Sequence, residues 1–198
     1  MKPDFDKLYG MAEVQAGYFT SAQAREAGFS APLLHHHTRQ GRFQRVAPRV
    51  YRLTHFPGSP WEDLFIAWLR TGPHSVISHD SALALYDLSD ALPAAIHVTV
   101  PRTASRRRPG LRLHTARLTP EEITSYMGLP VTTVPRTIAD VAFSGLADEL
   151  VIQAIHEALA RGLTTENELR AMARRRGGRM ARLLALAIRD GIKPTKSD

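Results

Sequence analysis

Apolar positions in the N-terminal quarter of the chain recur at helical spacing, within short segments bounded by residues that start or stop helices. The expected helices cover residues 4–17, 20–27 and 30–41. Asp4 and Ser30 are typical helix caps, and Gly28 and Gly41 suit the left-handed position after a helix. Alternating apolar residues on both sides of Pro48 then predict a small hairpin. This order of elements is that of a winged helix-turn-helix.

The rest of the chain alternates between helical and strand patterns. Prolines and a glycine between Phe56 and Pro60 predict a linker. Beyond it we expect helices at 61–69, 80–86, from 119 onward, 135–143, 147–161, 165–176 and 178–189, and strands at 75–78, 95–100, 111–115 and 131–134. The predicted fold class is therefore α/β (α+β), with a winged domain at 1–56, a linker at 57–60 and a mixed domain at 61–198 that ends in helices.

The composition favours a polyanionic partner, because 26 Lys and Arg outnumber 19 Asp and Glu and give a formal net charge of +7. The absence of cysteine excludes disulfides, cysteine zinc sites and thiol nucleophiles, and fits a reducing cytoplasm. No apolar run approaches the about 18 residues that a membrane span requires. We therefore expect a cytoplasmic protein without membrane contact.

Three consecutive histidines, His35 to His37, raise the question of a metal site. Successive residues of a helix point about 100° apart, so these imidazoles cannot converge on one ion. No Asp, Glu or Cys lies near enough in the sequence to complete a ligand set. With Leu34 in the core, His37 falls at the core edge one turn later, and its neighbours face outward. We expect no metal here.

The interval between Glu26 and Glu62 contains no acid and predicts a DNA-binding surface. In a helix-turn-helix, the third helix enters the major groove, and in a winged domain the hairpin tip lies along phosphates or the minor groove. The candidate DNA-binding residues are Ser30, His35, His36, Arg39, Gln40, Arg42, Arg45 and Arg49. The alternative is a solvated basic face on a winged helix that binds protein.

The stretch GLPVTTVPRTIAD, Gly128 to Asp140, resembles the GLPVT-x-x-x-RT-x-x-D signature of the AbiEi-type antitoxin family. The wing from Gly41 to Leu53, ISHDSA at 77–82 and HVTVPR at 97–102 agree with that family in order, so the resemblance covers nearly the full chain. The signature residues are Gly128, Pro130, Thr132, Arg136, Thr137 and Asp140. We expect them to build the domain, by capping and pairing a helix, rather than to perform chemistry.

The resemblance implies a function in two parts. The winged domain would bind double-stranded DNA at inverted repeats upstream of its own operon and repress it. The second domain would neutralise a cognate toxin, an AbiEii-type nucleotidyltransferase, in a phage-defence system. We expect a monomer or a weak dimer.

Arginines also gather in the second domain. The candidates for DNA or toxin contact are Arg106, Arg107, Arg108, Arg174, Arg175, Arg176, Arg179 and Arg182. An apolar stripe lies opposite the last of these, so the arginines are also interpretable as the solvated face of a core helix.

No motif favours catalysis: the chain has no Walker loop, G-x-S-x-G or H-E-x-x-H sequence. Ser78, His79 and Asp80 are residue types of a catalytic triad, but triad members meet in space rather than at adjacent positions. We expect no enzymatic activity, cofactor or metal. The alternative function is a stand-alone winged-helix transcriptional regulator whose C-terminal domain senses a ligand or dimerises.

Overall fold

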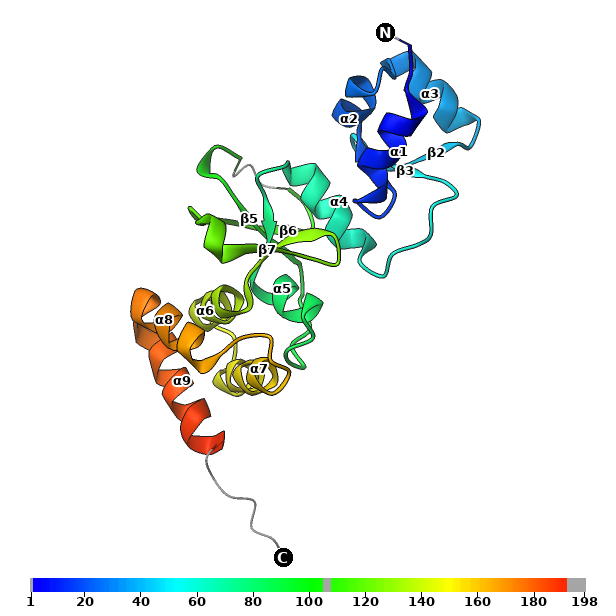
Figure 1. Ribbon diagram of the computed structural model, residues 1–198. Coiled ribbons are helices and arrows are strands. Elements are labelled where there is room, and N and C mark those ends of the chain that lie inside the picture. Colours follow the sequence, from blue (N-terminus) through cyan, green and yellow to red (C-terminus); the bar gives the residue numbers. More distant parts are fainter. Residues whose placement is uncertain (1, 105–107, 192–198) are drawn as a thin grey trace, which may run out of the picture.

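The computed structural model describes residues 2–104 and 108–191, and its N-terminal region is a helical unit with a small antiparallel sheet (Figure 1). Its elements are α1 (Phe5–Glu13), β1 (Tyr18–Thr20), α2 (Ser21–Glu26), α3 (Ala31–Arg39), β2 (Phe43–Ala47) and β3 (Val50–Leu53). The predicted winged helix-turn-helix order is confirmed. The pattern does not predict β1, which pairs antiparallel with β3 and makes β3 the central strand.

Local side chains explain these boundaries. The Asp4 carboxylate accepts the Lys7 N–H at 2.9 Å at the start of α1, and Thr20 forms a reciprocal capping box with Gln23 at the start of α2. Gly28 follows α2 with φ +84°, and a Cβ there would lie 2.6 Å from the Lys2 carbonyl oxygen. A side chain at this turn is therefore excluded by both backbone conformation and space.

The second region is a mixed sheet with helices on both faces. Its elements are α4 (Glu62–Thr71), β4 (Val76–Ile77), α5 (His79–Leu85), β5 (Ile96–Val100), η1 (Arg102–Ala104), β6 (Leu111–Thr115), η2 (Pro120–Glu122), β7 (Ile123–Tyr126), β8 (Leu129–Thr132), α6 (Val134–Ser144), α7 (Asp148–Ala160), α8 (Glu166–Arg176) and α9 (Gly178–Gly191). The strand order is β6-β5-β4-β8-β7. Figure 1 shows α4 between the sheet and the N-terminal region, and α5 and α6 on the opposite side, followed by the C-terminal helices. The predicted α/β (α+β) class with a helical end is confirmed.

The expected helix from residue 119 is wrong. Only a 3₁₀ turn forms, η2, and strand β7 follows at once. The cause lies in the next residues: Ile123, Thr124 and Tyr126 prefer strands, and Met127 and Gly128 adopt φ values of +52° and +81° that close a hairpin to β8. The strand placed at 131–134 is correspondingly observed earlier, at Leu129–Thr132.

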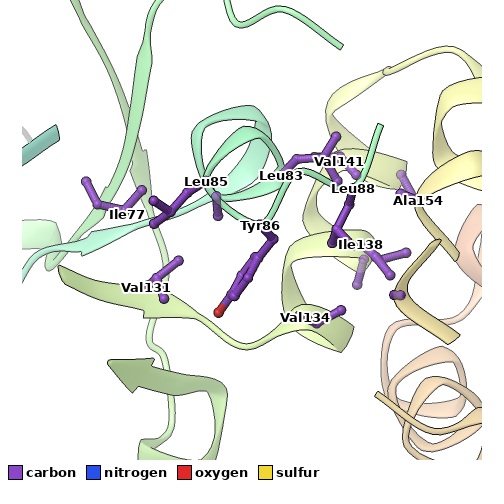
Figure 2. Packing of buried hydrophobic residues seen from close by; sticks show 14 of the residues in the cluster. Ile77, Leu83, Leu85, Tyr86, Leu88, Val131, Val134, Ile138, Val141 and Ala154 are labelled. Carbon is purple, nitrogen blue, oxygen red and sulfur yellow. The ribbon is translucent and has the colours of Figure 1, made fainter. Parts of the chain in front are cut away.

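Most of the main core lies on the side of the sheet covered by α5 and α6, and the same cluster continues to Leu64, Phe65 and Ala67 of α4 on the other side. Figure 2 shows Tyr86 between Val131 of β8 and Val134 of α6, with Leu88 and Ile138 to the right of its ring. The Tyr86 hydroxyl donates to the Thr132 carbonyl oxygen at 3.0 Å, so its one polar atom is satisfied inside an apolar cluster. This packing fixes the start of α6, where the family signature lies.

A smaller hydrophobic cluster holds α1, α2, α3 and the wing together, and includes Phe19, Phe29 and Phe43. Tyr18 belongs instead to the main cluster, where its ring stacks on Phe65 of α4 with centroids 5.8 Å apart. We still propose the domain boundary at residues 57–60. The two separate clusters support it, and the Tyr18–Phe65 stack joins the two domains.

Candidate nucleic-acid interface

Helix α3 buries one face against the N-terminal core. Leu34 and His37 are 4% and 7% exposed. The His37 ring contacts Phe29 and Phe43 edge-on, at centroid distances of 5.7 and 5.5 Å. Burial, with smaller effects of Arg42 and His36, lowers the pKa of His37, so the ring is neutral and apolar in behaviour. The core-edge position predicted for His37 is confirmed.

The opposite face of α3 is open to solvent. His35, His36, Arg39 and Gln40 are all exposed there, as the helical spacing predicts. An exposed helix face of this kind is what a helix-turn-helix presents to the major groove. The contact of these four side chains with bases remains a prediction.

The wing brings a second set of cations beside this face. Arg45 lies on β2, and Arg49 lies in the turn between β2 and β3 with φ +65°. The Arg49 carbonyl oxygen accepts the Ser21 N–H at 2.9 Å, which ties the turn to the start of α2. Both arginine side chains are exposed. The turn is therefore held in place while its charges stay accessible to phosphates.

A groove of about 280 Å³ runs between α3 and the wing. His35, Arg45 and Arg49 line it, together with Arg25 and Thr38, and no lining residue is acidic. Arg25 and Thr38 are not among the sequence candidates. Arg25 could have been found from its place in the last turn of α2, because in a helix-turn-helix the second and third helices pack at this corner.

Two other candidates already have partners within the domain. The Ser30 hydroxyl accepts the Leu33 N–H at 3.4 Å and caps α3. The Arg42 guanidinium lies 5.9 Å from the centre of the Phe5 ring, an arrangement typical of a cation–π contact. Both side chains are nevertheless exposed.

The arginines of the C-terminal helices are mostly paired inside their own domain. Arg179 donates to Asp148 and to the carbonyl oxygens of Ala142 and Leu146, and Arg182 donates to Asp148 at 2.7 Å. These bonds lower the pKa of Asp148. They tie the start of α9 to the end of α6 and the start of α7, which favours a structural role for these two arginines.

The remaining members of that set are divided. Arg174, Arg175 and Arg176 are all exposed on α8, and of these Arg175 lies 3.4 Å from Glu122 and Arg176 lies 3.7 Å from Asp140. Arg108 lies in the loop before β6, where its carbonyl oxygen accepts the Leu111 N–H at 3.1 Å. Arg106 and Arg107 lie outside the described residues.

Four of the signature residues, Thr132, Arg136, Thr137 and Asp140, are buried and bonded at the start of α6. The Arg136 guanidinium donates through Nε to Asp140 at 2.8 Å and through Nη1 to Glu122 at 2.8 Å. The Thr137 hydroxyl donates to the Thr132 carbonyl oxygen at 3.0 Å. Glu122, expected from the sequence in the first turn of a helix, is therefore a buried partner of the signature arginine. Gly128 forms the β7–β8 turn and Pro130 lies in β8.

Ser78, His79 and Asp80 do not assemble a triad. The Ser78 hydroxyl and His79 Nδ1 are 3.0 Å apart, but Asp80 lies 3.7 Å from His97 instead. His79 stacks on His114 with ring centroids 3.5 Å apart. We call His79, His97 and His114 the histidine cluster.

Burial is the main cause that lowers the pKa of each ring in the cluster, to about 3 for His79 and about 4 for His114. Three neutral imidazoles therefore lie together at the junction of α5, β5 and β6. Among the described residues, no group of three or more His, Cys, Asp and Glu side chains could hold a metal ion. None of the helices in the described ranges is long and apolar enough to cross a membrane.

Comparison with known proteins agrees with the sequence resemblance. Residues 12–54, from the end of α1 to the end of the wing, match the model of a family described as "Transcriptional regulator, AbiEi antitoxin". The chain is also similar to the crystal structure of the RV2827C protein from Mycobacterium tuberculosis, with a TM-score of 0.56 and 13% identity over 94% of this chain and 76% of that one. At this identity the likeness concerns the fold alone. No curated protein matches the sequence.

Proposed function

We propose, from the match of residues 12–54 to the AbiEi antitoxin family of transcriptional regulators, that this protein is an antitoxin that represses its own operon. The winged domain binds operator inverted repeats, and the second domain neutralises a nucleotidyltransferase-type toxin. The observation that carries the DNA-binding half is the solvent-exposed face of α3 beside an acid-free groove with arginines on the wing.

The chemistry of this surface suits a DNA duplex. An α-helix fits the major groove, where Arg39 and Gln40 have the side-chain donors that base edges accept. Arg45 and Arg49 on the adjacent wing would neutralise phosphates and release counterions. On the opposite face of α3, the neutral His37 ring packs against Phe29 and Phe43 and places no charge in the core.

Operator binding is tested with the DNA immediately upstream of the protein's gene and a scrambled duplex of equal length, titrated at two salt concentrations. We expect preference for the native duplex to survive at the higher salt, because base contacts do not depend on counterion release. If the protein binds both duplexes equally and this binding is lost at the higher salt concentration, the surface binds DNA only through nonspecific charge.

Toxin neutralisation is tested by expressing the full chain together with the nucleotidyltransferase encoded beside it. Growth should be restored by the intact protein and by a variant with Arg45 and Arg49 replaced by Ala, because neutralisation is assigned to the second domain. Retained operator binding without any rescue would instead identify a stand-alone transcriptional regulator. The arginines of α8 and α9 remain candidates for either contact, and the exposed Arg174 is the one to substitute first.

A further inference from the structure

A large cavity lies between the winged domain and the second domain, away from the groove beside α3. Its volume is about 1110 Å³. Met11 and Gln23 of the winged domain form one wall, and Trp68, Leu69 and Ile123 of the second domain form the other. Figure 1 shows the same arrangement of elements, with α1 and α2 on one side of α4 and the sheet on the other. Ligand cavities typically enclose about 300–1000 Å³ and often lie between domains.

The lining is mainly apolar and carries no charged side chain. None of its residues is Asp, Glu, Lys, Arg or His, in a chain where 23% of the residues are charged. Val14, which also lines it, is 69% exposed although it is a large aliphatic residue. A charged ligand would lose hydration here without gaining a partner, so the walls select against it.

The polar side chains on the winged-domain wall, those of Gln15, Thr20 and Gln23, are already bonded to one another or to backbone groups. The Gln15 amide nitrogen donates to the carbonyl oxygens of Met11 and Tyr18, at 2.6 and 3.3 Å. The Gln23 amide nitrogen donates to the Gln15 side-chain oxygen at 3.2 Å, and its own oxygen accepts the Thr20 N–H at 2.8 Å. These two amides therefore offer little to a ligand.

The exposed polar side chains left for recognition come from β7, and on the same wall the buried Nε1 of Trp68 has no hydrogen-bond partner among the described residues. Thr124 and Ser125 line the cavity and are exposed. β7 is also the last strand of the sheet, so its outer edge carries backbone groups that no neighbouring described strand pairs. Polar recognition is thus confined to one wall, and the opposite wall contributes apolar contact.

We propose that this cavity binds a small, uncharged, mainly apolar molecule with a hydroxyl or carbonyl group directed at β7. Because both domains form its walls, a bound molecule stabilises one arrangement of the winged domain against the second domain. The site is independent of the proposed function, since no residue of the DNA-binding candidate set lines it.

The experiment uses the full chain and the uncharged fluorescent probe N-phenyl-1-naphthylamine. We expect saturable binding with a stoichiometry of about one, and a rise of the unfolding temperature with probe concentration. Trp68 lines the cavity, so its emission should be transferred to the bound probe. A Trp61→Phe variant leaves Trp68 as the donor, since the chain has 2 Trp.

Substitutions that fill the cavity locate the site. Ala22 is exposed on α2 and lines the cavity, so Ala22→Phe should weaken probe binding by about tenfold or more without disturbing the core. Ser125→Phe fills it from the opposite wall and should do the same. The matched control is Ala160→Phe, at an exposed position at the end of α7.

The absence of saturable binding to the unmodified chain would overturn the proposal. Equal affinity of Ala22→Phe, Ser125→Phe and Ala160→Phe for the probe would overturn it as well, because the probe would then bind elsewhere. Circular dichroism of each variant confirms that the fold is retained.

Discussion

Arg136 donates through Nε to both carboxylate oxygens of Asp140, at 2.8 and 2.9 Å, and both side chains are buried. The two residues are one helical turn apart in α6, which is why the RT-x-x-D spacing brings them together. Burial raises the pKa of Asp140, although the Arg136 charge acts in the opposite direction. The buried surroundings disfavour the charge of Asp140, and the two hydrogen bonds from Arg136 compensate for it.

Arg136→Ala should destabilise the protein by about 3–5 kcal/mol, because it leaves Glu122 and Asp140 buried without their main cation. Urea unfolding of the full chain measures this change. The matched control is Arg170→Ala, which removes an exposed pair with Glu166 one turn away and should cost about 0.5 kcal/mol or less. Equal effects of the two substitutions would contradict a structural role for the signature.

The histidine cluster predicts that stability falls in mild acid. His79, His97 and His114 have lowered pKa values when folded, whereas in the unfolded chain each takes up a proton near pH 6.5. The unfolded state therefore binds more protons below that pH, and each histidine removes about 1.4 kcal/mol of stability per pH unit. The loss should extend from about pH 6.5 down to about pH 4 for His114.

The charged residues around the histidine cluster change the size of this loss of stability in acid, but not its direction. Asp80 raises the pKa of His97, while Arg112 lowers the pKa of all three rings and Arg136 also lowers that of His79. His114→Phe keeps a ring stacked on His79 but removes one proton site, so the slope of unfolding free energy against pH should shrink. Exposed His35→Ala is the control and should leave the contribution of the cluster intact. If the slope of unfolding free energy against pH is the same in His114→Phe, His114 does not contribute to the loss of stability in acid.

The wing arginines predict a change in salt dependence. Replacing Arg45 or Arg49 by Ala should reduce the slope of log K against log salt for operator binding by about one unit for each phosphate interaction that the substitution removes. Fluorescence anisotropy with labelled operator DNA at several salt concentrations measures the slope. Arg170→Ala, remote from the groove, should leave it unchanged. If the double variant keeps the slope of the unmodified protein, the wing does not contact phosphates.

Local chemistry explains which parts of the molecule the sequence predicts. Caps such as Asp4 and Ser30 and the glycine after α2 mark the helices of the winged domain, and these elements are observed where the pattern places them. The strands β1 and β7 lie beside residues that signal the start of a helix, Thr20 at the cap of α2 and Pro120 to Glu122 before β7, and they form because a partner strand is present.

In the candidate sites too, some contacts follow from spacing within one element and others require two elements to pack together. The Arg136–Asp140 pair follows from i,i+4 spacing, but Glu122 joins it only because the β7–β8 hairpin folds back. The histidine cluster comes from α5, β5 and β6, and no spacing within one element signals it. The exposure of α3 positions was predictable from one buried neighbour, Leu34, whereas the contribution of Arg25 to the groove required the packing of α2 on α3.

Gln40 offers a test that separates base recognition from phosphate binding. Its side chain is exposed at the C-terminal end of α3. In the major groove, a side-chain amide can form two hydrogen bonds with the edge of an adenine. Gln40→Ala should cost about 1–3 kcal/mol on the native operator and little on a scrambled duplex, while the salt slope stays constant because no charge is removed. Competition binding with the two duplexes measures both quantities, and exposed Asn167→Ala on α8 serves as the control. A reduction of affinity shared equally by both duplexes would place Gln40 on the DNA backbone rather than on a base.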